Sequence, residues 1–572
     1  MRSKMRAFHT GTRLALIAAL LASLALAKPA SLQADDAAQQ ALLTNVRAHI
    51  KHVFVIYQEN RSFDSYFGTF AGADNLATEE ARAHGFRQYE PIGNQWITPF
   101  RISDPDLADA DHSRPALYTK ANGGKMDLFV AAEEGRMLRL GATLDDAQRV
   151  GILTMAHEDC DMIPFLWKYA KTFTLYDHIF QGMYGPSTPG NIDLIAAQTG
   201  QTQWARHPSQ AVGHADTGPG VPVVDDLYPA FGPYHNGEPK AKQVDLSFAN
   251  LFLTLSGTQA TSAVIDNDDI KDDIASLAGS GKPAIPWGWY QEGFKDDGSG
   301  TYPAYVAHHN VAQYFGYVRQ NAALWNGVHD ITEVLPAIKS GALPDKAVVF
   351  IKGGYRNPFG WQPANNDPAV RKAFRGDDDH PGYADSQVSE AMVATMVNAI
   401  ARSKYWADSA IIILWDDSEG FYDHVPPPIF EECPDGHPCG DGPRVPLILI
   451  SPYAQSGAVI ADPGDHASFA KLLGAIFDLP ALASLPDEKP YLPRGPRDAN
   501  PAITNLLGGF DAARLAGSTP PLPASAAQIP DATVAAFPPP MSCKSLGMTP
   551  VAVPGGMASP PPGWQARTSR QY

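Results

Sequence analysis

Short runs of consecutive hydrophobic residues recur along the chain and predict buried strands. Four of them, rich in β-branched side chains, are Val53–Tyr57, Ala347–Ile351, Ala410–Trp415 and Val445–Ile450. Because these runs lack the alternation of a half-exposed strand, they are typical of parallel strands covered on both faces. Polar or glycine-rich residues follow each run, as they do at the carboxyl ends of strands in an open α/β sheet.

Hydrophobic residues at three- and four-residue spacing predict helices between these strands. Ser386–Ser403 has this spacing, with Ser386 and Ser389 as candidate N-caps, and Ala467–Phe477 is a second predicted helix. Strands that alternate with helices predict an α/β fold with a mostly parallel central sheet and helices on both faces. Sites in such folds lie in the crevice at the carboxyl ends of the strands.

Two regions lack this pattern. The segment from about 200 to 300 is rich in Gly, Pro and Asp, and we expect surface loops there. From Ser518 to the end, twelve prolines fall within 55 residues. We therefore expect residues 28–515 to form one catalytic domain, and residues 516–572 to form an extended wrap or a disordered tail.

The N-terminal residues resemble a secretory signal peptide. Arg2, Lys4, Arg6 and Arg13 precede a hydrophobic run from Leu14 to Ala27, and no acidic residue interrupts them. We expect residues 1–27 to be removed, with a second possible cleavage after Ala34; the alternative is an uncleaved membrane anchor. The n-region has no twin-arginine pair, which favours the Sec route and a periplasmic or secreted protein if the source is bacterial.

Composition narrows the classes of partner. The 572 residues carry a formal net charge of −17, which becomes −21 when the four basic residues of the leader are removed. An acidic chain lacks the basic surface that grips a phosphate backbone, so we expect no nucleic acid partner.

The four cysteines are too few for a disulfide scaffold. In an oxidising compartment Cys433 and Cys439 are expected to form a disulfide, although His437 between them leaves a metal knuckle as the alternative. Cys160 and Cys543 could pair with each other, and their spacing does not decide the matter.

Oxygen-bearing side chains follow two of the predicted strands. The first strand is followed by Glu59 and Asn60, whose oxygens suit a hard cation; the alternative is an Asx turn with a helix cap. Asp416 and Asp417 end another buried strand, where adjacent carboxylates repel each other unless a cation neutralises them. A solvent-facing cap at Asp417 is the alternative.

Candidate catalytic groups lie in polar turns. Ser187 stands between Gly185-Pro186 and Pro189, and prolines that fix the backbone suit a nucleophile, although a rigid turn with a solvated serine has the same pattern. Histidines next to Asp, Asn or another His suit a phosphoryl site, which needs cationic donors or an acid for the leaving group. They are His112, His308, His309, His380 and His424.

Together these motifs resemble the bacterial phosphoesterase family that contains secreted phospholipases C and acid phosphatases. The matching pieces run in family order from about residue 50 to 480. They are Gln58–Gly68, Asn122–Asp127, Gly185–Pro189, Trp289–Gly293, His308-His309, His380-Pro381, Gly420–Val425, Arg444–Pro446 and Ile450–Tyr453.

The resemblance implies an alkaline-phosphatase-like three-layer α/β fold and a metal-assisted hydrolase. It implies a divalent metal ion of unknown identity, held by Glu59, Asn60, Ser187, Asp416 and Asp417. Ser187 matches the nucleophile, which would form a phosphoserine, and the residues that match histidines around the phosphate are His112, His309 and His380.

Within the family the chain is closer to the acid phosphatase branch. The phospholipases C there generally have Thr at the nucleophile turn and Tyr-Asp-Glu at the second ligand strand, where this chain has Ser187 and Trp415-Asp416-Asp417. We therefore expect a phosphomonoesterase acting on small phosphate esters. The alternatives are a phospholipase C or other phosphodiesterase that acts on a phospholipid head group, and a binding protein with a degenerate site.

Overall fold

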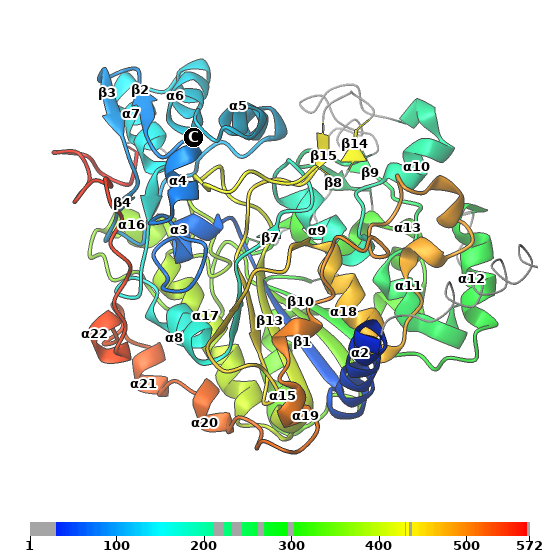
Figure 1. The fold of residues 1–572 in the computed structure, drawn as a ribbon. Helices are drawn as coiled ribbons and strands as arrows, with labels where there is room; N and C mark the ends of the chain where they lie inside the picture. The colour runs from blue at the N-terminus through cyan, green and yellow to red at the C-terminus, as the bar shows by residue number, and fades with distance from the viewer. Residues whose placement is uncertain are drawn as a thin grey trace, which may run out of the picture.

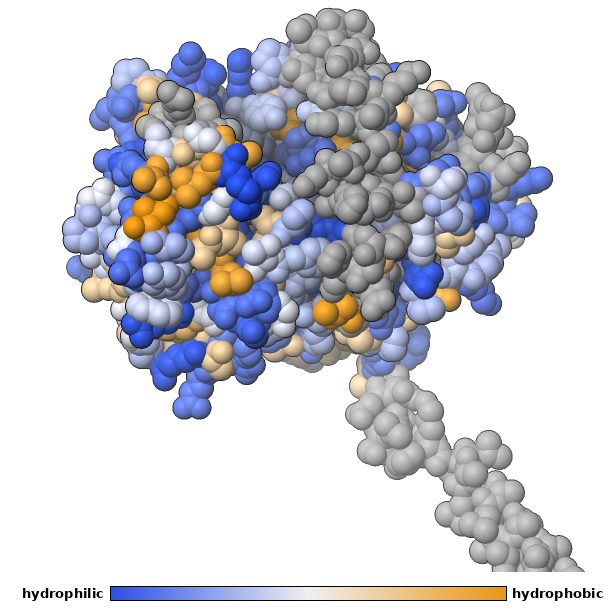
Figure 2. Space-filling model, turned by 90° about the horizontal axis from the view of Figure 1, so that it is seen from above, coloured by the Kyte–Doolittle hydropathy of each residue, from blue (hydrophilic) through white to orange (hydrophobic). Residues whose placement is uncertain are grey.

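The computed structural model describes residues 30–210, 222–230, 243–260, 268–295, 303–429, 431–433 and 438–568. The signal peptide predicted for residues 1–27 lies outside these ranges. Within them, no helix is both long and apolar enough to cross a membrane. Seen from above, the molecule presents a mainly hydrophilic surface on which hydrophobic groups form a few small patches (Figure 2).

An eight-stranded sheet forms the centre of the molecule, in the order β11-β10-β12-β1-β13-β16-β6-β17. The four strands predicted from hydrophobic runs are its four consecutive members β12, β1, β13 and β16. The bounds are β1 His52–Gln58, β6 Thr174–Tyr176, β10 Trp287–Gln291, β11 Val328–Asp330, β12 Ala347–Lys352, β13 Ser409–Trp415, β16 Leu447–Ile450 and β17 Ala458–Ile460.

The sheet is mostly parallel, as predicted, but one predicted direction is wrong. β16 pairs antiparallel with both β13 and β6, whereas the other pairs are parallel. The hydrophobic run that begins at Val445 is continuous because β16 is buried on both faces, and burial alone does not fix a strand's direction.

The register of the central strands positions the functional site. Tyr57 of β1 lies opposite Lys352 of β12 and Leu414 of β13, and Gln58 lies opposite Trp415. The residues that follow these strands therefore emerge together at one edge of the sheet.

Helices cover both faces of the sheet and give three layers (Figure 1). One layer contains α8 Pro164–Thr172, α15 Val334–Ser340 and α17 Ser386–Ala401, and the other contains α2 Ala30–His49, α9 Ser187–Ala196, α11 Leu251–Ser256 and α18 Ala467–Phe477. The predicted helices match α17 and α18. Asp385 caps α17, and its side chain accepts from the backbone N–H of Gln387 and Val388, so the prediction of a serine cap is wrong.

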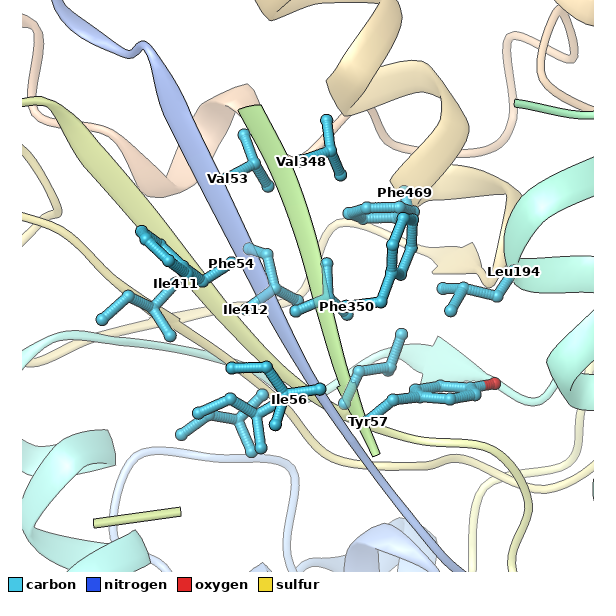
Figure 3. Packing of buried hydrophobic residues seen from close by; sticks show 14 of the residues in the cluster. Val53, Phe54, Ile56, Tyr57, Leu194, Val348, Phe350, Ile411, Ile412 and Phe469 are labelled. Atoms are coloured by element: carbon cyan, nitrogen blue, oxygen red, sulfur yellow. The ribbon is translucent and has the colours of Figure 1, made fainter. Parts of the chain in front are cut away.

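The main core lies between the sheet and these helices. Side chains from β1, β12 and β13 pack against each other, and Phe350 meets Phe469 of α18 with ring centroids 5.7 Å apart (Figure 3). Ile411 and Ile412 are fully buried. Each such side chain contributes about 1.5–3 kcal/mol to stability through the apolar surface that it removes from water.

The segment from about 200 to 300 is more regular than predicted. Within its described residues lie α10 Gln201–Arg206, α11, α12 Lys271–Ala278 and the sheet strand β10. The sequence of β10, Trp-Gly-Trp-Tyr-Gln, contains a glycine and no β-branched residue, so it lacks the usual sequence signal of a buried strand.

The proline-rich tail wraps around the molecule, one of the two forms expected for it. It includes the short helices α20 Ala524–Ala527, α21 Asp531–Val534 and α22 Cys543–Leu546. Ile529 and Val534 pack into the main core. A domain boundary at residue 516 stays a prediction.

Both cysteine pairs are closed. Cys433 and Cys439 form the expected disulfide, while His437 lies outside the described residues. Cys160 pairs with Cys543 and ties the tail to the domain across 383 residues of sequence.

Candidate active site

Ser187 is the first residue of α9 and lies above the end of the central strands. Its hydroxyl is buried, with the residue 1% exposed, so the alternative of a solvated serine on a rigid turn is wrong. Gly190, one turn into the helix, allows this close approach: a Cβ there would lie 2.5 Å from the backbone oxygen of Asp416. The start of α9 therefore packs directly on the end of β13.

Three of the predicted ligand oxygens surround the Ser187 hydroxyl. Ser187 Oγ lies 2.8 Å from Glu59 Oε2, 3.4 Å from Asn60 Oδ1 and 3.4 Å from Asp417 Oδ2. Glu59, Asn60 and Asp417 are all fully buried, which excludes a solvent-facing cap at Asp417. The helix that follows β1 is capped by Ser62, so the alternative of a helix cap at Asn60 is also wrong. Asn60 has φ of 50°, a left-handed conformation that asparagine tolerates better than most residues.

Asp416 completes the set through its neighbours. Its Oδ1 accepts from the backbone N–H of Asn60 at 3.2 Å and of Asp417 at 2.9 Å. Its Oδ2 lies 3.4 Å from Asn191 Nδ2 and 3.7 Å from Lys352 Nζ. We call Glu59, Asn60, Ser187, Asp416 and Asp417 the ligand cluster.

Acidic side chains outnumber basic ones in the ligand cluster. Burial raises the pKa of Glu59 well above its ordinary value, and Asp416 raises it further. Burial also raises the pKa of Asp417 to about 8. Lys352, whose ammonium pairs with Glu59 Oε1, is the cation that faces the set. Three carboxyl groups thus face Lys352, and Glu419 and His112 add one further acidic and one further basic group next to Asn60.

The donor set fits a hard or borderline divalent cation. Carboxylate, amide and hydroxyl oxygens are the ligands that such cations prefer, and the cluster offers no sulfur. A cation would also neutralise the carboxylates that burial otherwise disfavours in their charged form. The oxygen donors of these residues therefore fit a cation, and the metal site itself stays a prediction.

Two of the three predicted histidines contact the ligand cluster, and the third contacts one of them. His309 Nε2 lies 3.3 Å from Glu59 Oε2. His112 Nε2 lies 3.2 Å from Asn60 Nδ2, and His112 Nδ1 lies 2.8 Å from the Ala110 carbonyl oxygen. The His380 ring stands edge-on to that of His112, with centroids 5.5 Å apart.

The surroundings of these histidines move their pKa values in opposite directions. Burial lowers the pKa of His112, but nearby carboxylates, with Glu419 first, raise it overall well above its ordinary value. Burial lowers the pKa of His309 and of His380 well below the ordinary value, and neighbouring cationic groups add to this.

Sequence reasoning missed two residues of this site. Lys352 follows directly after a predicted strand, and only its register opposite Tyr57 places its ammonium beside Glu59. Glu419 accepts from Asn60 Nδ2 at 2.7 Å, and its other oxygen accepts from the Ala110 N–H at 2.8 Å. Glu419 thereby turns the Asn60 amide so that its oxygen faces Ser187.

His424, a fifth histidine noted in the sequence, belongs to a different buried cluster. His424 Nδ1 lies 2.7 Å from Asp64 Oδ2. Arg444 pairs with Asp64 at 3.1 Å and with Asp423 at 2.8 Å. We call Asp64, Asp423, His424 and Arg444 the balanced ion cluster, because its two buried acidic side chains face two basic ones; the partly exposed Asp74 also contacts it, with Oδ1 3.1 Å from His424 Nε2.

Fold and site together define a three-layer α/β protein with a buried serine over an oxygen-rich, negatively charged set. Comparison with known families agrees with this description. The model of the Phosphoesterase family matches residues 50–480, and the chain belongs to that family.

Similar curated proteins carry phospholipase C names. The chain is 23% identical to "Non-hemolytic phospholipase C" of Burkholderia pseudomallei over 84% of this chain and 62% of that protein. It is 22% identical to "Hemolytic phospholipase C" of Pseudomonas aeruginosa over 80% and 56%, respectively. It is 24% identical to "Phospholipase C B" of Mycobacterium tuberculosis over 75% of this chain and 74% of that protein. The chain thus spans about three fifths of the length of the first two.

Solved structures resemble the chain only distantly. A protein in the alkaline phosphatase superfamily from Vibrio parahaemolyticus is 9% identical, with a TM-score of 0.29, over 77% of this chain and 75% of that one. At this TM-score the likeness adds nothing to the assignment, which rests on the family match.

Proposed function

We propose that the protein is a metal-dependent phosphoric ester hydrolase, and specifically a phosphomonoesterase of the acid phosphatase type. The observation that carries the proposal is the buried Ser187 hydroxyl, which lies within 2.8–3.4 Å of oxygens of Glu59, Asn60 and Asp417 at the start of α9. Membership of the Phosphoesterase family supports the reaction class.

The residues of the chain account for the steps. Ser187 Oγ forms a bond to phosphorus, the bond to the leaving oxygen breaks, and the serine proton passes to Glu59 Oε2, its acceptor at 2.8 Å. The oxygen of a water molecule then bonds to phosphorus, the bond from phosphorus to Ser187 Oγ breaks, and the proton held by Glu59 returns to the serine oxygen. The helix start at Ser187 favours the negative charge that accumulates there.

The histidines and the cation divide the remaining work. His112, His309 and His380 hold the phosphate oxygens or give a proton to the leaving oxygen. A divalent cation bound by Glu59, Asn60, Ser187, Asp416 and Asp417 would lower the pKa of the serine hydroxyl and neutralise non-bridging oxygens. Lys352 stays beside Glu59 and reduces the repulsion between the carboxylates.

Phospholipase C activity is the second candidate, favoured by the names of the curated relatives. A diester substrate needs the same nucleophile and cation, so the ligand cluster does not discriminate between the two. The residues that favour the monoesterase are Ser187 in place of a threonine and the Asp416-Asp417 pair.

Substrate comparison tests the proposal. We expect steady phosphate release from p-nitrophenyl phosphate, faster than release of phosphorylcholine from phosphatidylcholine, and loss of both in Ser187→Ala. Peptide mass spectrometry of acid-quenched enzyme should find phosphate on Ser187. A better rate with the diester would reverse the choice of branch, and full activity in Ser187→Ala would refute the nucleophile.

We also propose that the protein is exported through the signal peptide of residues 1–27. The supporting features are the basic n-region, the hydrophobic run from Leu14 to Ala27 and the two closed cysteine pairs. N-terminal sequencing of the mature protein should begin near Lys28, and an intact N-terminus in the membrane fraction would contradict this.

A further inference from the structure

The tail ends against a segment that carries part of the candidate active site. It follows the lower edge of the molecule through α20, α21 and α22, and then rises beside β4 Phe100–Arg101 (Figure 1). The disulfide from Cys543 to Cys160 fixes the start of this rise. The family match ends at residue 480, so the tail lies outside it.

Residues 564–567, which we call the C-terminal clamp, make three kinds of contact there. Trp564 packs edge-on against Phe100, with ring centroids 5.3 Å apart, and its Nε1–H donates to the Arg149 carbonyl oxygen at 3.0 Å. The buried Ala566 accepts from the Ala108 N–H at 2.9 Å. Apolar and backbone contacts therefore seat the clamp on the protein.

Arg567 supplies the ionic contact. Its Nη1 donates to both carboxylate oxygens of Asp104, at 2.6 and 2.8 Å, and lies 3.4 Å from Asp106 Oδ2. Asp106 is fully buried and also faces the acidic Asp385. Removal of the guanidinium would leave Asp104 and Asp106 without its compensating charge.

The segment held by Arg567 connects to the loop of His380. The carbonyl oxygen of Leu107 accepts from the Gly382 N–H at 2.7 Å, and that of Pro105 accepts from the Ser386 N–H at 3.2 Å. Asp106 and Asp385 form an antiparallel bridge. The segment from 104 to 107 thus runs alongside residues 382–386.

The same segment continues to His112. The Ala110 N–H donates to Glu419, and the Ala110 carbonyl oxygen faces His112 Nδ1 at 2.8 Å. His112 then contacts Asn60 of the ligand cluster. One continuous chain of contacts therefore joins Arg567 to the imidazole beside the site.

We propose that Arg567 is a positioning residue for the reaction: through Asp104 and Asp106 it holds the segment that places His112 beside the ligand cluster. This role rests on the proposed function, because only the proposed function gives His112 a part in catalysis. It predicts a dependence of the reaction rate on a residue beyond the matched family region.

A double-mutant cycle tests whether Arg567 acts through His112. We expect Arg567→Ala to lower kcat by about tenfold, because small displacements of catalytic groups are costly, with a smaller change in KM. In a His112→Ala background the same change should cost less than about twofold, since coupled residues are not additive. An equal loss in both backgrounds would overturn the role.

Two further variants separate positioning from folding. Arg567→Lys should recover part of kcat, because it restores a cation near Asp104 and Asp106. Arg402→Ala breaks another tail ion pair, with Asp531 at 2.8 Å, and should keep wild-type kcat and KM. Losses in Arg402→Ala equal to those in Arg567→Ala would contradict a specific role of the clamp.

Hydrogen exchange supplies a readout that needs no activity. Arg567→Ala should speed backbone exchange in residues 104–112 and 382–386 and leave β1 and β13 unchanged. Unchanged exchange in the first two segments would overturn the role even if kcat falls. An inactive wild type would instead refute the proposed function, and the catalytic part of this role with it.

Discussion

Two buried clusters of charge lie close together in the sequence and differ in one respect. The segments after β1 and β13 supply residues to both: Glu59 and Asp416 to the ligand cluster, and Asp64 and Asp423 to the balanced ion cluster. In the balanced ion cluster Arg444 and His424 face the acidic side chains. In the ligand cluster three carboxyl groups face Lys352, and the further pair Glu419 and His112 beside Asn60 leaves the excess of acidic groups unchanged.

The difference indicates which cluster serves function. A buried ion pair with its partners in place needs nothing further, so the balanced ion cluster fastens the two loops to each other. An excess of buried negative charge is unfavourable unless a cation is bound, and such sites are typical of function. A histidine within a family motif can belong to either cluster: His424 lies in such a motif and is part of the balanced ion cluster.

The largest effect is expected at the nucleophile. Ser187→Ala should reduce kcat/KM by on the order of 10³-fold or more, because the covalent route is lost. The free energy of unfolding of the variant should stay within about 0.5 kcal/mol of the wild-type value, since only one hydroxyl is removed. Steady-state kinetics and denaturant unfolding measure both, and retained activity would contradict the assigned site.

The next effect is on stability, in the balanced ion cluster. Arg444→Met removes the guanidinium from Asp64 and Asp423 and should destabilise the protein by about 3–5 kcal/mol, the cost of an uncompensated buried charge. The matched control is Arg402→Met, whose ion pair with Asp531 is exposed and contributes about 0–1 kcal/mol. Equal losses of unfolding free energy in the two variants, measured by urea unfolding, would contradict a special role of the buried Arg444.

Neutralising one acid should have opposite effects in the two clusters. In metal-free protein at pH 8, Asp417→Asn should raise the free energy of unfolding by about 1 kcal/mol, because it relieves repulsion among buried carboxylates. Asp423→Asn should lower it by about 1–3 kcal/mol, because Arg444 loses a partner. The same sign in both variants would refute the proposed difference.

The smallest effect concerns pH. Burial lowers the pKa of His424, but the neighbouring Asp64 carboxylate raises it, and the result is a pKa of about 9. This value lies above the unfolded value of about 6.5. The folded state therefore binds the extra proton, so this contribution is complete below about pH 6.5 and is lost as pH rises through 9. His424→Gln should flatten the fall of the melting temperature over that range, and an unaltered slope would contradict it.

Most of the fold could be predicted because its signals are local. The four central strands and the helices α17 and α18 are continuous hydrophobic patterns, which burial on both faces of a sheet requires. The direction of β16 depends on its connection to neighbouring strands, and no local pattern records that. β10 was missed because an aromatic strand with a glycine lacks the usual β-branched signal.

The site was predicted to the extent that its residues follow strand ends or match the family motif. Ser187, Glu59, Asn60 and Asp417 converge as expected. Lys352 could not be recognised, because a lysine after a strand is usually exposed and only the register brings it to Glu59.

Metal content measured together with activity tests the central claim most directly. Purified wild-type protein should hold one divalent cation per chain by elemental mass spectrometry, and activity should fall on chelation and return on reloading. Asp416→Asn and Asp417→Asn should lose the cation, while Asp423→Asn in the balanced ion cluster should keep it. Full phosphatase activity in wild-type protein that contains no metal would contradict the account.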